Sequence, residues 1–227
     1  MTSLLNTLLL LAAQQIPMSD LTKDVGAKPP KDAIVLFDGK STDLWQHGAD
    51  KPVKWTLENG ELTVAPGTGN IVTKAVYKSF HLHLEFATAD MPDKMSQSKS
   101  NSGVKLHTVY EIQILDSVNN PTHVAGMCAS IYTQRDPDKN VCRKPGEWQA
   151  YDIDFTAPTF TPDGNTDKKP RVTVYWNGEL VHKNVEIPGP TNQKPSDKPL
   201  LKEGAILLQD HGAKVKFKNI WIVPAKE

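Results

Sequence analysis

Several common signals are scarce or absent in this sequence of 227 residues. Only two cysteines occur, and no Cys-x-x-Cys or Cys/His spacing typical of a zinc site is present. The 26 basic and 26 acidic residues cancel and form no basic run, which argues against nucleic acid or an anionic membrane surface as partner. Without a glycine-rich phosphate loop, we expect no nucleotide or organic cofactor. No sustained helical periodicity follows the first residues, which argues against a helical fold.

An uncharged apolar run, Leu8–Ala13, lies near the start of the chain and ends in small residues. It is typical of a secretory signal, although no Lys or Arg precedes it, and a short amphipathic lead-in is the alternative. The run is too short to span a bilayer. We therefore expect residues 1–19 to be a signal peptide or leader, 20–32 a linker or arm, and 33–227 a single domain. The mature protein is expected to be periplasmic or secreted, with no transmembrane segment.

The two cysteines, Cys128 and Cys142, lie in the same long irregular region, residues 117–147. In an exported protein they can form a disulfide. The alternative is two unrelated free thiols, and the sequence does not decide between them. Irregular segments of this length inside a compact domain are usually functional or disordered.

Short runs with two-residue alternation account for most of the remaining sequence. In Phe80–Phe86 the apolar side chains face a core, while His81, His83 and Glu85 face away and line a polar sheet surface. Metal binding by the two histidines is the alternative. Asn-Gly pairs at 59–60 and 177–178 predict two tight β-hairpins. Further strands are expected at 33–37, 55–57, 62–64, 71–73, 104–108, 110–116, 148–155, 172–176, 179–182, 204–209 and 215–223. This pattern predicts an all-β sandwich of antiparallel sheets with little helix.

The segment 101–116, Asn-Ser-Gly-Val-Lys-Leu-His-Thr-Val-Tyr-Glu-Ile-Gln-Ile-Leu-Asp, combines turn, strand and polar features. Its first three residues predict a turn. Beyond them, Glu111 and Gln113 project from one face of a strand whose other face is apolar. Unpaired polar groups are costly to bury, so these two need partners, which are either other side chains or a substrate. For Glu111 the side-chain alternative is a buried ion pair with Lys105.

Glu111, Gln113 and Asp116 have the spacing E-x-Q-x-x-D. It resembles the E-x-D-x-x-E strand of jelly-roll glycosidases of the laminarinase and lichenase type, whose outer carboxylates are nucleophile and acid/base. Retaining glycosidases need carboxyl groups about 5 Å apart. Here the middle residue is an amide, the last is the shorter Asp, and strict alternation directs Asp116 to the opposite face unless a bulge intervenes. A retaining glycosidase is therefore a weaker alternative, and Asp116 is either catalytic or a backbone-bonding residue at a strand end.

A set of short motifs in a fixed order is more specific than any one of them. The set comprises Leu36–Lys40, Leu44–Trp45, Trp55, Asn59–Leu62, Tyr77–Leu82, Glu85–Phe86, Asn101–Gly103, Tyr110–Asp116, Ile131–Tyr132, Lys144–Gln149, Trp176–Gly178, Gly204–Gly212 and Val215–Ile220. In this order and spacing it resembles the 3-keto-disaccharide hydrolase domain family over residues 34–224. The resemblance implies a concanavalin A-like jelly-roll β-sandwich, usually exported. It also implies action on glycosides that a partner sugar 3-dehydrogenase has oxidised to a 3-ketone.

A ketone at C3 of a sugar acidifies the hydrogen on C2. A positioned base can remove this proton, the C1 substituent can leave by elimination, and water can add to the resulting enone, which gives net hydrolysis. Such a route needs a general base, a group that stabilises the enolate oxygen and help for the leaving group. The resemblance also implies a divalent metal ion of unknown identity in some members, which would grip the ketone and a neighbouring hydroxyl.

These roles are assigned to residues of the matching motifs. The predicted catalytic residues are Glu111, as general base or metal ligand, His211, as acid or metal ligand, and Asp116. The predicted substrate-binding residues are Asn101, Gln113 and Gln209 for hydroxyl or carbonyl groups, Lys105 for the ketone, and Tyr132 and Trp148 for the sugar face. The structural alternatives are a turn residue for His211, strand-to-strand hydrogen bonds for the amides, a solvated or paired Lys105, and a core position for Trp148. A non-catalytic carbohydrate-binding module on the same fold is the second functional hypothesis.

Overall fold

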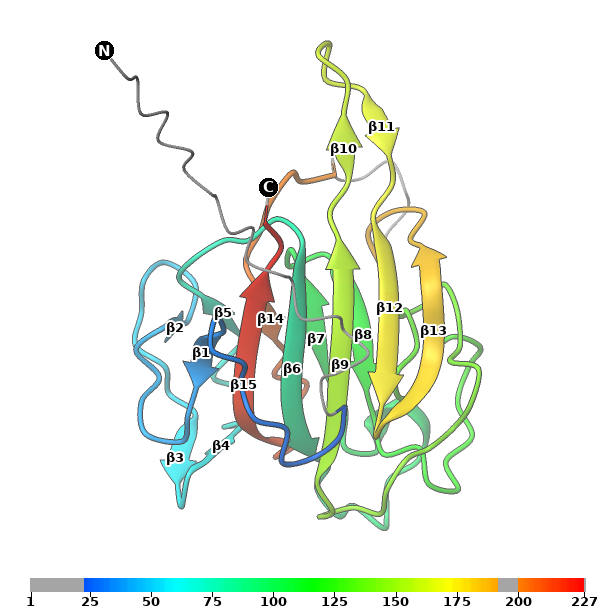
Figure 1. Cartoon of the computed structure of the whole chain (residues 1–227). Coiled ribbons are helices and arrows are strands. Elements are labelled where there is room, and N and C mark those ends of the chain that lie inside the picture. Colours follow the sequence, from blue (N-terminus) through cyan, green and yellow to red (C-terminus); the bar gives the residue numbers. More distant parts are fainter. Residues whose placement is uncertain (1–22, 192–199, 227) are drawn as a thin grey trace, which may run out of the picture.

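Two antiparallel β-sheets face one another across an apolar core (Figure 1). The computed structural model describes residues 23–191 and 200–226. Within these residues the one helical segment is a 3-10 turn, Ser96–Ser98, and no helix is long and apolar enough to cross a membrane. The prediction of an all-β jelly-roll sandwich with little helix is confirmed. The predicted leader, residues 1–19, lies outside the described residues.

The larger sheet has eight strands. Its order is β13 (Glu179–Glu186), β12 (Arg171–Trp176), β9 (Gln149–Thr156), β6 (Phe80–Ala87), β15 (Lys216–Pro224), β4 (Glu61–Thr63) and β3 (Thr56–Glu58). Strand β1 (Ile34–Phe37) also pairs with β15. A separate hairpin of β10 (Thr159–Phe160) and β11 (Thr166–Lys168) projects beyond one end of the sheet in Figure 1.

The smaller sheet has five strands and lies behind the larger one in Figure 1. Its order is β2 (Trp45–Gln46), β5 (Ile71–Thr73), β14 (Leu207–Leu208), β7 (Ser102–Leu106) and β8 (Tyr110–Ile114). Because β8 ends this order, the segment after it, residues 117–147, is free to form a long loop beside the sheet edge. That segment contains no regular strand, as the sequence predicted.

The core is formed by apolar side chains, which alternate with outward-facing side chains along the paired strands of both sheets. On the smaller sheet Val104 pairs with Ile112, and both are fully buried. On the larger sheet Leu82 pairs with Ile153 on one side and with Ile222 on the other, and all three are fully buried. Burial of one such aliphatic side chain contributes about 1.5–3 kcal/mol relative to exposure. The opposite faces of the two sheets carry the polar groups.

The two predicted Asn-Gly hairpins are confirmed. Asn59 and Gly60 connect β3 to β4, and Asn177 and Gly178 connect β12 to β13. All four residues have φ between 53° and 82°. A type I′ turn needs positive φ at both central residues, which asparagine tolerates and glycine adopts freely.

The turn predicted at Asn101–Gly103 is wrong, because its last two residues already belong to β7. The chain instead reverses between β7 and β8 at His107 and Thr108, which both have positive φ. Gly103 is needed for space rather than for a turn, since a Cβ atom there would lie 2.4 Å from Oε1 of Glu111. The glycine lets the Glu111 side chain lie close against the neighbouring strand.

His81, His83 and Glu85 face away from the core as predicted, but the polar sheet surface that they line is buried. They are only 5%, 0% and 1% exposed. The segment 23–33 covers them, and the backbone N–H of Gly26 donates to Oε1 of Glu85 at 2.7 Å. Figure 1 shows this dark-blue segment crossing in front of β15 and β6. The described part of the predicted arm is therefore packed against the sheet.

Candidate functional site

Polar side chains gather on the outer face of the smaller sheet, on β7, β8 and the segment after β14. Glu111 pairs with Lys105, and Gln113 pairs with Gly103, across β7 and β8. The backbone N–H of Gln209 donates to the carbonyl of Gly103, which continues the row onto the next segment. Because alternate positions of a strand share a face, Glu111, Gln113 and Lys105 project together, opposite the core.

The Glu111 side chain is the buried acid of this face. Glu111 is 2% exposed, and its Oε2 lies 3.0 Å from Nζ of Lys105, whose side chain stays partly exposed. Burial raises the pKa of Glu111, and the opposing attraction of Lys105 and His211 does not cancel this effect. The raised pKa increases the tendency of the Glu111 carboxylate to accept a proton.

His211 and Tyr132 lie close enough to Glu111 for electrostatic coupling. His211 is exposed in the turn after β14, and the preceding Asp210 anchors that turn by accepting the backbone N–H of Gly69 at 2.9 Å. Tyr132 donates its backbone N–H to the carbonyl of Glu111 at 3.0 Å. Burial and the Glu111 charge both raise the pKa of the Tyr132 phenol. The structure thus brings the predicted base, acid and one predicted stacking residue into one neighbourhood.

Three amide side chains near Glu111 carry a buried oxygen with no hydrogen-bond partner in the described part of the chain. These atoms are Oδ1 of Asn101, Oε1 of Gln113 and Oε1 of Gln209. The amide nitrogens of Asn101 and Gln113 both donate to Oε1 of Gln97, at 3.1 and 2.9 Å, so the oxygens are the atoms left over. A buried acceptor without a donor costs about 1–3 kcal/mol. Strand-to-strand bonding in the described part of the chain therefore does not account for these atoms.

Asp116 and Trp148 have their partners elsewhere. At the end of β8, Oδ2 of Asp116 lies 3.0 Å from Nζ of Lys99, and Oδ1 accepts a backbone N–H two residues further on. This is the strand-end role that was the alternative to catalysis. On the outer side of the larger sheet, Nζ of Lys218 lies 4.1 Å from the ring centroid of Trp148. The predicted roles of these two residues beside Glu111 gain no support from their positions.

The described residues do not form a complete metal site around Glu111. Nowhere in residues 23–191 and 200–226 do three or more His, Cys, Asp or Glu side chains converge as metal ligands. The two predicted ligands, Glu111 and His211, therefore lack a third ligand of these types, and Lys105 already occupies one Glu111 oxygen. Two ligands of these types, one of them paired with an ammonium group, fall short of the three protein ligands of a catalytic zinc site.

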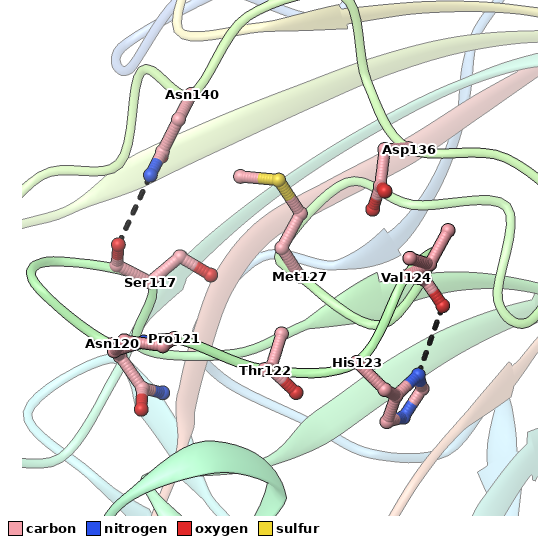
Figure 2. Close-up of a pocket in the computed structure, with 9 residues that line it drawn as sticks. All are labelled: Ser117, Asn120, Pro121, Thr122, His123, Val124, Met127, Asp136 and Asn140. Atoms are coloured by element: carbon pink, nitrogen blue, oxygen red, sulfur yellow. Dashed lines mark hydrogen bonds between the residues drawn. The ribbon is translucent and has the colours of Figure 1, made fainter.

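Gln97, which the sequence did not single out, connects the amides to a neighbouring pocket. Its amide nitrogen donates to Oγ1 of Thr122 at 2.7 Å. Thr122 lines a pocket of about 260 Å³, shown in Figure 2, together with Ser117, Asn120, Pro121, His123, Val124, Met127, Asp136 and Asn140. The rings of His123 and Tyr132 are in contact, with centroids 5.7 Å apart. The pocket therefore adjoins the Glu111 face, and the length of the loop that forms it was the sequence signal available for it.

The fold and these side chains define a jelly-roll domain with a buried carboxylate among amide groups on its smaller sheet. The sequence profile of the family described as "3-keto-alpha-glucoside-1,2-lyase-like domain" matches residues 32–223. The chain belongs to this family, and the resemblance found in its motifs is confirmed.

Relatives with known names or structures are consistent with this membership. A protein named 3-keto-disaccharide hydrolase from Bacteroides thetaiotaomicron is 25% identical over 223 residues, covering 82% of this chain and 76% of that protein. A crystal structure from Parabacteroides distasonis, described as that of a candidate glycosyl hydrolase, is 41% identical with a TM-score of 0.83 and covers 88% of this chain and 86% of that one. A second structure from that organism with the same description is 22% identical with a TM-score of 0.65, covers 86% of this chain and 94% of that one, and supports the fold alone.

Proposed function

We propose that this protein cleaves 3-keto-glycosides by proton abstraction at C2, elimination at C1 and addition of water. Family membership supports a glycoside-acting enzyme of the hydrolase type. The observation that carries the ketone-specific route is Glu111, a buried carboxylate with a raised pKa whose ion-pair partner is the Lys105 ammonium at 3.0 Å. A retaining glycosidase needs a second carboxylate about 5 Å away. The sequence candidate for it, Asp116, is paired with Lys99.

Glu111 and Lys105 act in sequence in this proposal. Glu111 takes the C2 proton, and the electrons of the C–H bond move toward the C3 carbonyl to form an enolate. Negative charge therefore leaves the carboxylate and develops on the C3 oxygen. Because the protonated Glu111 no longer attracts it, the Lys105 ammonium is released to stabilise the enolate. The ion pair that holds the base before the reaction thus supplies the stabilising cation during it.

The leaving group and the water complete the cycle. Collapse of the enolate expels the oxygen substituent of C1, which needs a proton. His211 is the candidate donor, because it lies within electrostatic range of Glu111 and is exposed to exchange protons with solvent. Water then adds at C1, His211 recovers its proton from that water, and Glu111 returns a proton to C2. One water is consumed, and both side chains end as they began.

The amides and Tyr132 are proposed to hold the sugar. The buried oxygens of Asn101, Gln113 and Gln209 would accept hydrogen bonds from sugar hydroxyls, which would remove the cost of leaving these acceptors unpaired. The half-buried ring of Tyr132 offers an apolar surface beside Glu111 for one face of the sugar.

We also propose that the protein acts after export, in the periplasm or outside the cell. The leader-like composition of residues 1–19 supports this location. The elimination requires a ketone at C3, so an oxidation must come before it. A sugar 3-dehydrogenase is therefore the proposed supplier of substrate.

The test is incubation of the full chain with a 3-keto-glucoside and with the unoxidised parent glucoside, each with and without a chelator. We expect turnover of the keto sugar alone, and the same rate with chelator, because the described residues offer no complete metal site. Turnover of both sugars would indicate an ordinary glycosidase. Binding without turnover would indicate a carbohydrate-binding module. Either of these two results contradicts the proposal.

A further inference from the structure

The pocket in Figure 2 lies beside the Glu111 face, and the proposed reaction gives it no role. Two residues connect its lining to that face. Tyr132 donates its backbone N–H to the carbonyl of Glu111 at 3.0 Å, and its ring meets that of His123 with centroids 5.7 Å apart. Gln97, which accepts two amides of the face, donates to Oγ1 of Thr122 at 2.7 Å. The pocket therefore adjoins the position proposed for the sugar.

The size and the lining of this pocket fit one small ring that has apolar faces and polar edges. Its volume is about 260 Å³. Drug-sized ligands occupy pockets of roughly 300–1,000 Å³, so a single sugar ring fits better than an oligosaccharide. Pro121, Val124 and Met127 supply apolar surface, and the other lining residues are polar. A sugar ring combines C–H faces with hydroxyl edges in the same way.

Most of the polar side chains that line the pocket have already used their hydrogen bonds. The amides of Asn120 and Asn140 each use nitrogen and oxygen on neighbouring groups. Oγ1 of Thr122 accepts from the side chains of Gln97 and Ser96. A hydroxyl group has two acceptor lone pairs and one donor, so the O–H hydrogen of Thr122 is what remains for a ligand.

The hydrogen-bond acceptors left for a ligand belong to His123 and Asp136. Nδ1 of His123 lies 2.9 Å from the carbonyl oxygen of Val124, as drawn in Figure 2. Because a carbonyl oxygen only accepts, Nδ1 carries the hydrogen of the neutral ring and Nε2 is an acceptor. Oδ1 of Asp136 accepts the hydroxyl of Ser130 at 2.9 Å, and among the described residues Oδ2 has no hydrogen-bond or ion-pair partner. A pocket with these acceptors suits a ligand that brings hydroxyl donors.

We propose that this pocket binds the leaving group of the 3-keto-glycoside and that Asp136 selects a leaving group that carries hydroxyl groups. The proposal rests on the proposed function, because it places the C1 substituent of the sugar beside Glu111 in the adjoining pocket. Oδ2 of Asp136 accepts a hydroxyl of the leaving group, and the Thr122 hydroxyl donates to a second oxygen. No bond of the substrate breaks in the pocket, so Asp136 is a specificity-determining residue and not a catalytic one.

The experiment compares Asp136→Asn with the wild type on a 3-keto-disaccharide whose leaving group is glucose and on methyl 3-keto-glucoside. Asparagine keeps an oxygen for Ser130 and replaces the free acceptor with a donor. We expect kcat/KM for the disaccharide to fall roughly 10- to 100-fold, the usual effect of losing a hydrogen bond to a charged group. The value for the methyl glycoside should stay within about twofold, because a methyl group makes no hydrogen bond in the pocket. Equal losses on both substrates, or no loss on either, would overturn the proposal.

Asp138→Asn is the matched control in the same segment. Asp138 pairs with Arg135 at 2.6 Å and does not line the pocket. This variant should leave kcat/KM for both substrates unchanged. A loss on the disaccharide equal to that of Asp136→Asn would contradict the assignment, because removal of any nearby negative charge would then explain it.

A titration of the wild-type protein with glucose separates failure of this proposal from failure of the proposed function. In NMR spectra we expect glucose to shift the ring resonances of His123 and not those of His47, whose ring is bonded to Asn70 and Lys54. Asp136→Asn should abolish the shift. If the wild type cleaves neither keto sugar, the proposed function fails and the titration decides whether the pocket binds a sugar. If cleavage occurs but glucose leaves His123 unshifted, the pocket proposal alone fails, and this holds even if the variant does not fold.

Discussion

The two sheets each carry a buried glutamate on the face turned away from the core, and the two environments differ in kind. Glu85, on the larger sheet, accepts the backbone N–H of Gly26 and the amide of Asn219, both at 2.7 Å, and lies 3.5 Å from Nζ of Lys218. Burial opposes ionisation there, but hydrogen bonds from His83, Asn219 and Gly26 prevail and lower the pKa of Glu85 to about 2. Glu111, on the smaller sheet, has Lys105 alone as ion-pair partner in the described residues, and its pKa is raised.

The contrast separates a structural carboxylate from one available for chemistry. A carboxylate held by several donors is stabilised as an anion and has little tendency to take a proton. A buried carboxylate with one flexible cation as its partner keeps that tendency. The two side chains are similarly inaccessible to solvent, yet their pKa values shift in opposite directions, and the hydrogen-bond donors around Glu85 contribute to that difference.

The largest expected effect comes from Glu111→Gln. Turnover of a 3-keto-glucoside should fall by roughly 100- to 10,000-fold, which is the usual contribution of a general base. The free energy of unfolding should change by less than about 1 kcal/mol, because a neutral amide removes the cost of burying the charge and Lys105 can turn to solvent. Steady-state kinetics and denaturant unfolding on one preparation measure both quantities. A large loss of stability with turnover retained would make Glu111 the structural residue.

Glu85→Gln is the matched control on the other sheet and should show the opposite pattern. It removes the negative charge that faces Lys218 and replaces one acceptor oxygen with an NH2 donor, and breaking a buried charged network in this way is strongly destabilising. We expect Tm to fall by roughly 5–10 °C. Turnover at a temperature where the variant is fully folded should stay within about twofold of wild type. Loss of turnover in the folded variant would mean that the two sheet faces are coupled.

A smaller effect is expected in the pH dependence of stability. Burial alone would lower the pKa of His81 and of His83, but hydrogen bonds to Asp152 prevail and raise both above 6.5. Their stabilising contribution is therefore complete below pH 6.5 and is lost as pH rises through the raised values. The Glu85 contribution is complete above pH 4.5 and is lost as pH falls toward 2.

The combined contribution of His81, His83 and Glu85 is thus greatest between about pH 4.5 and 6.5, and denaturant unfolding of the wild type and of variants at these positions measures it. His81→Gln should reduce the decline on the alkaline side, and Glu111→Gln should leave it in place. A wild-type protein whose stability rises from pH 6.5 to 9 would show that these histidines are not held as cations.

Side-chain alternation and turn residues in the sequence predicted the features that depend only on neighbouring residues, namely strand faces and hairpins. The alternation in Phe80–Phe86 placed every side chain on its observed face, and both Asn-Gly pairs form hairpins. Burial of the outer face of β6 was not predictable in this way, because it depends on the segment 23–33 returning across the sheet. Gly103 was misread as a turn residue, since its requirement arises from the Glu111 carboxylate on the neighbouring strand.

The candidate site likewise contains residues whose positions follow from local sequence signals and residues whose positions depend on the folded chain. The face shared by Glu111, Gln113 and Lys105 follows from strand alternation and pairing. The contribution of Gln97 does not, because its hydrogen bonds to two amides and to Thr122 join segments that only the folded loop brings together. The positions of Asp116 and Trp148 likewise depend on Lys99 and Lys218, which no spacing in the sequence connects to them.

The central claim is that Glu111 exchanges the hydrogen at C2 of a 3-keto sugar during cleavage. The most direct measurement is the reaction of a 3-keto-glucoside in D₂O, with the product's C2 position followed by NMR. We predict deuterium at C2 with the wild-type enzyme, above the level in enzyme-free buffer and with Glu111→Gln, because the acid proton exchanges with solvent before water adds. Cleavage with only protium at C2 would contradict the account.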